Sequence, residues 1–106
     1  MDDFIELFLT CEDQAEAERI AQSLLSQHLV ACVKFEPVHS KFWWKGEIDE
    51  GDEVKISMLS VADNFDAIEA EVAKLHSYET FVLQAVPLAR ISKDAAKWLT
   101  ENTRPL

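Results

Sequence analysis

Apolar residues along the chain recur with two periods, which predict alternating strands and helices. The nearly continuous apolar run at 4–10 favours a buried strand. After it, Asp13 and Glu16 have the spacing of a capping box, which places a helix start at Asp13. Apolar positions then recur three and four residues apart, as on one face of a helix. These positions are Ala17, Ile20, Ala21, Leu24 and Leu25.

The middle of the chain predicts two strands joined by a turn. A strand is expected from Val30 to Trp44, with a bend or bulge at Pro37, because proline cannot donate a hydrogen bond to a sheet. The acidic stretch 46–52 contains both glycines and predicts a solvated turn. Apolar and polar residues alternate at 54–58, which predicts a half-buried strand.

The last part of the chain predicts a helix, a strand and a short final helix. Asp63 or Asn64 is expected to cap the first of these helices, and Ser92 the second. Residues 81–88 are apolar at nearly every position and predict a strand. The expected inward-facing residues are Phe65, Ile68, Val72 and Leu75 in the first helix, and Ala95, Trp98 and Leu99 in the second. The order predicts an α+β, ferredoxin-like β-α-β-β-α-β fold, an antiparallel sheet with helices on one face plus a short C-terminal helix.

One face of the predicted sheet has no helix to cover it. Because the strand at 81–88 is apolar on both faces, it needs a cover on each, which favours self-association. Trp43 and Trp44 are successive residues of a strand and face opposite ways. One is expected in the core. The other is expected as an anchor between subunits or in a cleft between them, where it would stack on a planar ligand.

The length and net charge of the chain limit the number of domains and the classes of partner it can have. A chain of 106 residues fits one domain, residues 1–106. Its formal net charge of −10 argues against a nucleic-acid partner and against anionic membranes. The N-terminus lacks the basic start of a secretory signal, and no apolar run is long enough for a membrane helix. We therefore expect a cytoplasmic protein with reduced thiols.

Four segments resemble the CutA divalent-ion tolerance family. Residues 29–33 are close to the family's Leu-Ala-Ala-Cys-Val, and residues 76–79 are close to its His-Pro-Tyr-Glu. Residues 40–48 are close to Ser-x-Tyr-x-Trp-x-Gly-x-Ile, and residues 10–13 followed by 17–21 also match. Trp98 fits the family's last helix. The four matches occur in the family's order and span most of the chain.

The resemblance implies a tight homotrimer that is linked to tolerance of copper and other divalent metals. No nucleophile elbow, phosphate loop or zinc-protease motif is present, so we expect no catalysis. Nitrogen-regulatory signalling proteins form similar trimers that bind nucleotides between subunits. That fold-level analogy gives an alternative function, a trimeric signalling or binding module that holds a small ligand in the cleft between subunits. Its candidate binding residues are Trp44, Tyr78 and Glu79.

Copper or another divalent cation is the candidate cofactor. The family's proposed metal site draws on a cysteine, a histidine and a downstream acid. His76 is present, whereas Leu9 and Val82 occupy the other two positions. Cys11 follows Leu9 by two residues, so both face the same way if the strand continues, and Cys11 is the candidate replacement. Copper prefers thiolate and imidazole ligands, which makes Cys11 and His76 of neighbouring chains the candidate metal ligands. The alternative is a buried structural cysteine and an ordinary cleft histidine.

Two further expectations concern neighbouring residues. His76 lies near the end of a predicted helix, where a cationic imidazole is favoured and Glu79 is a candidate partner. Alternatively, His76, Tyr78 and Glu79 fix the turn into the next strand through hydrogen bonds. Cys32 lies in an apolar tetrad and is expected to pack in the core as a small hydrophobic residue.

Overall fold

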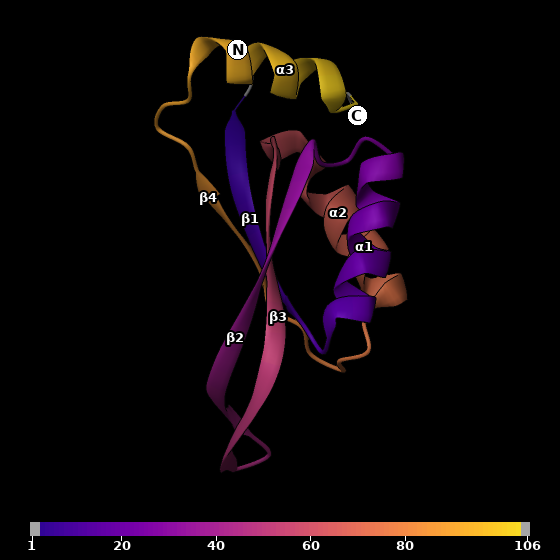
Figure 1. Cartoon of the computed structure of the whole chain (residues 1–106), viewed down its shortest axis with the longest axis vertical. Helices are drawn as coiled ribbons and strands as arrows, with labels where there is room; N and C mark the ends of the chain where they lie inside the picture. The colour runs from indigo at the N-terminus through magenta and orange to yellow at the C-terminus, as the bar shows by residue number, and fades with distance from the viewer. Residues whose placement is uncertain (1–2, 105–106) are drawn as a thin grey trace.

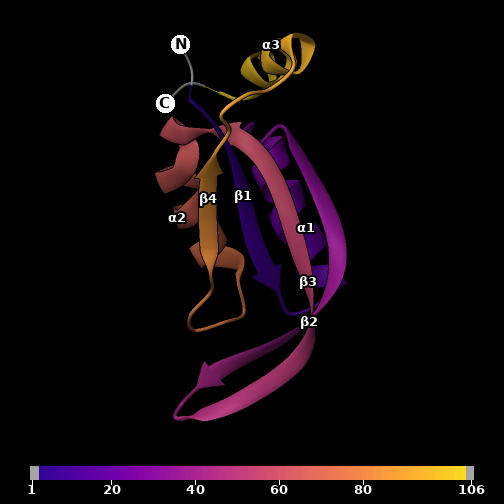
Figure 2. The same ribbon diagram turned by 90° about the vertical axis from the view of Figure 1, so that its left-hand side faces the viewer.

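The computed structural model describes residues 3–104, which form one antiparallel sheet with two helices packed on one face (Figures 1 and 2). A third helix lies across one end of the sheet (Figure 1). The strand order is β2-β3-β1-β4. The elements are β1 (Phe4–Cys11), α1 (Gln14–Ser26), β2 (Cys32–Trp44), β3 (Glu47–Val61), the short 3₁₀ helix η1 (Ala62–Asn64), α2 (Phe65–Leu75), β4 (Leu83–Pro87) and α3 (Lys93–Asn102). The predicted ferredoxin-like order of elements is confirmed.

The core lies between the sheet and the helices α1 and α2. Alternate residues of β1 are buried toward the helices, as a strand's two-residue period requires. Leu9 and Cys11 both belong to this buried set, so they share a face as predicted. The fully buried side chains include Leu7, Leu9, Ile20, Leu24, Leu29, Ile56, Met58, Ile68 and Val72. Both Trp98 and Leu99 were expected to face inward, but only Leu99 is buried; Trp98 is exposed.

The three predicted caps have different outcomes. Asp13 is the N-cap of α1, and its side chain accepts a hydrogen bond from the Glu16 amide at 2.8 Å. Asn64 and Ser92 occupy the N-cap positions of α2 and α3, but neither side chain caps its helix. Instead, the Asn64 side chain donates to the Leu29 carbonyl at 3.2 Å, because it is buried and turned toward the core.

The predicted turn at 46–52 is wrong. β2 and β3 are joined by only Lys45 and Gly46, whose φ angles are 50° and 83°. Two left-handed residues match the twist of the flanking strands, which makes such two-residue turns favourable. Residues 47–52 therefore lie in β3.

Pro37 pairs with Val54 in an unbroken register, so the predicted bulge is absent. β2 is an edge strand, where proline is tolerated, and the hairpin bends away from the rest of the sheet (Figure 2).

The far half of this hairpin projects beyond the sheet. β1 pairs with β3 only at 54–61, so residues 38–44 and 47–53 pair only with each other. We call these two segments the arm. The arm lengthens the molecule to 44 × 26 × 21 Å. Both tryptophans lie on the arm and are exposed, so the expectation that one of them is in the core is wrong; the exposed large apolar residues of the arm are Phe42, Trp43, Trp44 and Ile48.

The sheet face opposite the helices is open. Cys32 pairs with Leu59 on this face and is only half-buried, so its predicted place in the core is wrong. The pleat explains the difference, because the neighbouring Val33 takes the core-facing position opposite the buried Met58.

Gly46 provides a direct test of the hairpin turn. A Cβ at Gly46 or at Gly51 meets nothing within 4 Å, so an alanine clashes with no neighbouring residue at either site. A difference between the two substitutions would therefore come from the backbone conformation. Only Gly46 has a left-handed φ, so Gly46→Ala should lower the free energy of unfolding by about 1 kcal/mol in urea titrations. Gly51→Ala is the matched control and should be neutral or slightly stabilising. Equal effects of the two substitutions would contradict this turn geometry.

Candidate metal centre

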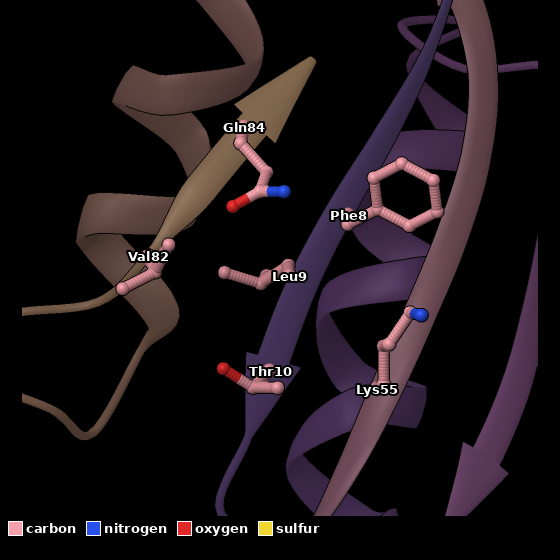
Figure 3. Close-up of a pocket in the computed structure, with 6 residues that line it drawn as sticks. All are labelled: Phe8, Leu9, Thr10, Lys55, Val82 and Gln84. Atoms are coloured by element: carbon pink, nitrogen blue, oxygen red, sulfur yellow. The ribbon is translucent and has the colours of Figure 1, made fainter. Parts of the chain in front are cut away.

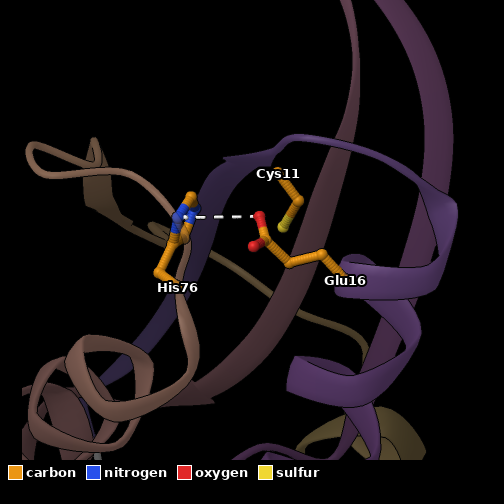
Figure 4. Close-up of side chains that lie close together, drawn as sticks. All are labelled: Cys11, Glu16 and His76. Atoms are coloured by element: carbon orange, nitrogen blue, oxygen red, sulfur yellow. Dashed lines mark ion pairs between the residues drawn. The ribbon is translucent and has the colours of Figure 1, made fainter.

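Cys11, Glu16 and His76 offer one ligand atom each, and these atoms all lie within 4.8 Å of one another (Figure 4). We call these residues the donor group. Cys11 ends β1, Glu16 lies in the first turn of α1, and His76 follows the last residue of α2. The structure thus brings the two predicted metal ligands together within one chain rather than from neighbouring chains.

Glu16 is a buried carboxylate with several hydrogen-bond partners. Its side chain is 2% exposed. Oε1 accepts from the Glu12 amide at 2.9 Å, and Oε2 accepts from the Ser77 amide at 2.8 Å. Burial by itself would raise the pKa of Glu16, but the hydrogen bonds from Ser77 and Glu12 outweigh it, so the pKa is lowered. Glu16 is therefore ionised at neutral pH.

The two ring nitrogens of His76 have different roles. The side chain is fully buried. Nε2 lies 2.9 Å from the Thr10 carbonyl, while Nδ1 accepts from the Tyr78 amide at 3.1 Å. These partners fit a neutral ring that carries its proton on Nε2, because Nδ1 must have a free lone pair. Nδ1 faces Glu16 Oε1 at 3.6 Å (Figure 4). Metal-binding histidines commonly donate their second N–H to a carbonyl in this way.

Cys11 is held as a thiol. Its side chain has no exposed surface. Burial, followed by the negative charges of Glu16, Glu53 and Asp13, raises its pKa to about 12. At pH 7 nearly all molecules therefore carry the neutral thiol. A metal that binds sulfur here must therefore displace a proton.

Together the donor group offers sulfur, imidazole nitrogen and carboxylate oxygen. Metal–ligand bonds of about 2.0–2.3 Å hold such atoms roughly 3–4 Å apart, so the group would have to contract slightly around an ion. Glu16 is the member that sequence reasoning missed. The available signal was its position four residues before Ile20 and eight before Leu24, on the buried stripe of α1. A carboxylate on such a stripe needs partners in the interior.

The residues predicted to hold a small ligand are not together within one chain. Trp44 pairs with Glu47 near the tip of the arm. The Tyr78 hydroxyl instead donates to Glu53 at 2.6 Å, six residues further along β3, or roughly 20 Å away along the strand. Glu79 is exposed, and Glu16 rather than Glu79 lies beside His76, so the predicted partner of His76 is corrected.

A separate hollow lies on the open face of the sheet (Figure 3). Its volume is about 260 Å³. Lys55 lines it, and the ammonium nitrogen lies 3.6 Å from the Glu36 carboxylate and 4.9 Å from the centre of the Phe8 ring. Because these contacts already engage the Lys55 charge, the hollow presents a mainly apolar surface. The lining residues are Phe8, Leu9, Thr10, Lys55, Val82 and Gln84.

Comparison with known proteins decides the family. The family model described as CutA1 divalent ion tolerance protein matches residues 5–102. The chain belongs to this CutA1 family. It is 37% identical to the divalent-cation tolerance protein CutA of Archaeoglobus fulgidus, over 91% of this chain and 94% of that protein. The CutA of Thermus thermophilus is 30% identical, over 92% of this chain and 95% of that protein.

Solved CutA structures share the fold. The structure of the Archaeoglobus fulgidus protein, described as periplasmic, superposes with a TM-score of 0.92 at 34% identity, and covers 93% of this chain and 97% of that one. Rice CutA1 superposes with a TM-score of 0.94 at 26% identity, over 97% and 95% of the two chains.

This CutA chain is non-catalytic, as its family is. No helix within residues 3–104 is long and apolar enough to cross a membrane. The cytoplasmic location stays a prediction.

The lowered pKa of Glu16 predicts a pH dependence. A carboxylate whose pKa is lower in the folded state than its ordinary value of 4.5 stabilises the fold above that pH. This stabilisation is lost as the pH falls through the folded-state value. Glu16→Gln should lower the free energy of unfolding by about 1–3 kcal/mol at pH 7, because one backbone N–H then faces an amide N–H.

Urea titrations of both proteins at one chain concentration test this dependence. The difference between wild type and Glu16→Gln should shrink steadily below pH 4.5. A difference that stays constant from pH 7 to pH 3 would show that folding does not lower the pKa of Glu16.

Proposed function

We propose that this CutA chain acts in the response to divalent metal ions as a non-catalytic homotrimer, and that its donor group binds copper weakly. The observation that carries the metal-binding part is the convergence of Cys11, Glu16 and His76 within 4.8 Å in the interior of one chain. Thiolate and imidazole are ligands that copper prefers, and cuprous copper is the softer of its two common ions.

The same geometry supports weak rather than tight binding. The metal must displace the proton of a thiol whose pKa is about 12. It must also compete with the Tyr78 amide for Nδ1 of His76 and with two backbone amides for the Glu16 oxygens. In compensation, a cation next to the Glu16 carboxylate lowers the cost of forming a thiolate beside it.

Two features of the chain support the homotrimer. The arm is a two-stranded ribbon whose large apolar side chains are exposed, and such ribbons are marginally stable when alone. The open sheet face adds Val86, which is 41% exposed, and the apolar hollow. Exposed large apolar side chains in this number favour a protein interface. The exposed residues support association between chains, and the proposed number of three subunits rests on the family resemblance.

Copper binding is tested by titrating the protein with cuprous ion, without oxygen, against a competing chelator. We expect one copper per chain, with the affinity reduced at least tenfold in Cys11→Ser and in His76→Ala. Cys32→Ser removes the other thiol, which lies on the open sheet face, and should leave the affinity unchanged. Equal, weak binding by wild type and Cys11→Ser would mean that the net negative charge alone attracts the metal.

The homotrimer is tested by light scattering during gel filtration. The mass should be about 36 kDa, three times the 12.1 kDa of one chain. Val86→Asp places a charge on the open sheet face and should shift the mass toward one chain. Ala15→Asp introduces the same charge at an exposed position of α1, on the other side of the sheet, and should leave the mass unchanged. A monomeric wild type at micromolar concentration would contradict the proposal.

A further inference from the structure

Tyr78 reaches across the end of the strand that carries Cys11. It belongs to the connection between α2 and β4, while its hydroxyl donates to Glu53 of β3 at 2.6 Å. In the sheet, β1 lies between β4 and β3. The last β1 residue, Cys11, pairs with Val54, the residue next to Glu53. The Tyr78 side chain therefore ties the α2–β4 connection to the base of the arm, beside the buried thiol.

The backbone of this connection also occupies the donor group. The Ser77 amide donates to Glu16 Oε2 at 2.8 Å, and the Tyr78 amide donates to Nδ1 of His76 at 3.1 Å. Two of the three residues that would bind a metal thus already use ligand atoms for successive backbone N–H groups. The rings of Tyr78 and Phe81 lie 4.7 Å and 5.4 Å from the His76 ring, which encloses the imidazole.

We propose that Ser77 and Tyr78 form a strap that closes the donor group, and that the Tyr78–Glu53 hydrogen bond is its latch. Opening the strap frees Nδ1 of His76 and one Glu16 oxygen and exposes the Cys11 thiol, so a metal ion enters only from the open state. The identity of the entering ion rests on the proposed copper binding. The strap itself does not, because its opening is measurable without any metal.

The latch is tested by the rate at which iodoacetamide, a neutral reagent, alkylates Cys11. Cys32→Ala in every protein leaves Cys11 as the sole thiol. Tyr78→Phe keeps the ring and the net charge but removes the bond to Glu53. The loss of a hydrogen bond to a charged acceptor should populate the open strap about tenfold more and raise the alkylation rate by the same factor. A change of less than twofold would overturn the proposal.

Leu99→Ala controls for general loss of stability. Leu99 is the fully buried residue of α3, and this helix lies at the end of the sheet opposite the α2–β4 connection (Figure 1). This variant should unfold more readily than Tyr78→Phe and yet alkylate more slowly. If its rate equals or exceeds that of Tyr78→Phe, Cys11 becomes accessible by global unfolding and there is no strap.

Amide hydrogen exchange gives a second, independent measurement. Tyr78→Phe should speed exchange at Ser77 and Tyr78 by the factor seen in alkylation, because strap opening releases both N–H groups. Exchange in the middle of β1, for example at Leu7, should stay unchanged. Equal acceleration at both places would overturn the local opening.

Cuprous ion then separates the strap from the proposed function. We expect it to bind the Tyr78→Phe protein about tenfold faster than the parent protein. If alkylation accelerates but neither protein binds copper, the strap is supported and the copper proposal fails. If both proteins bind copper at the same rate, the copper proposal is supported and the strap does not control entry.

Discussion

A carboxylate with 2% of its side chain exposed must be satisfied by hydrogen bonds, and Glu16 meets this requirement by joining three segments of the chain. The Glu12 amide follows β1, the Ser77 amide follows α2, and Glu16 itself lies in the first turn of α1. Leaving such a charge without partners would cost several kcal/mol. The end of β1, the start of α1 and the α2–β4 connection are therefore held in one arrangement by a single charge.

The same charge determines the chemistry of its neighbours. It contributes, after burial, to the raised pKa of Cys11, and it lies 3.6 Å from Nδ1 of His76. The result is an anion beside a neutral thiol and a neutral imidazole. Such a group is well suited to a cation, because a cation would offset the Glu16 charge and replace the thiol proton. The backbone N–H groups of Glu12 and Ser77 already offset part of the Glu16 charge.

The parts of the fold that depend on periodicity could be predicted from the sequence. The apolar run at 4–10 and the apolar stripe on α1 indicated the two layers, and Asp13 marked the start of the helix. The hairpin could not be predicted in this way, because the acidic residues 47–52 have the composition of a turn while forming an exposed strand. The actual turn contains Gly46 and Lys45, and the left-handed φ of a lysine has no clear sequence signal.

The donor group was predictable only in part. Cys11 and His76 could be named, because thiol and imidazole are recognisable metal ligands. Glu16 was interpreted only as part of a helix cap, although its place on the buried stripe gave a second signal. The contacts from the Ser77 and Tyr78 amides could not be found, because backbone N–H groups are present at every residue except proline. Their partners depend on the path of the chain after α2.

The same distinction applies to assembly. Exposed apolar residues on the arm could be expected to be near an interface, but Trp43 and Trp44 were wrongly divided between core and surface. The reason is geometric. The arm extends past the end of β1, so among residues 3–104 no helix and no further strand lies beside either of its faces. The arm therefore has no core-facing side within one chain. For this reason the alternation of Trp43 and Trp44 did not predict their burial.

X-ray absorption spectroscopy of the cuprous-loaded Cys32→Ala protein tests the central claim most directly, because it identifies the atoms bound to the metal. With Cys32 removed, sulfur among the ligands can come from Cys11 or from the thioether of a methionine. Cys11→Ser in the same background separates these two sources. We predict one sulfur ligand together with imidazole nitrogen, and loss of the sulfur in the Cys11→Ser protein. A spectrum with only light-atom ligands, unchanged by Cys11→Ser, would contradict it.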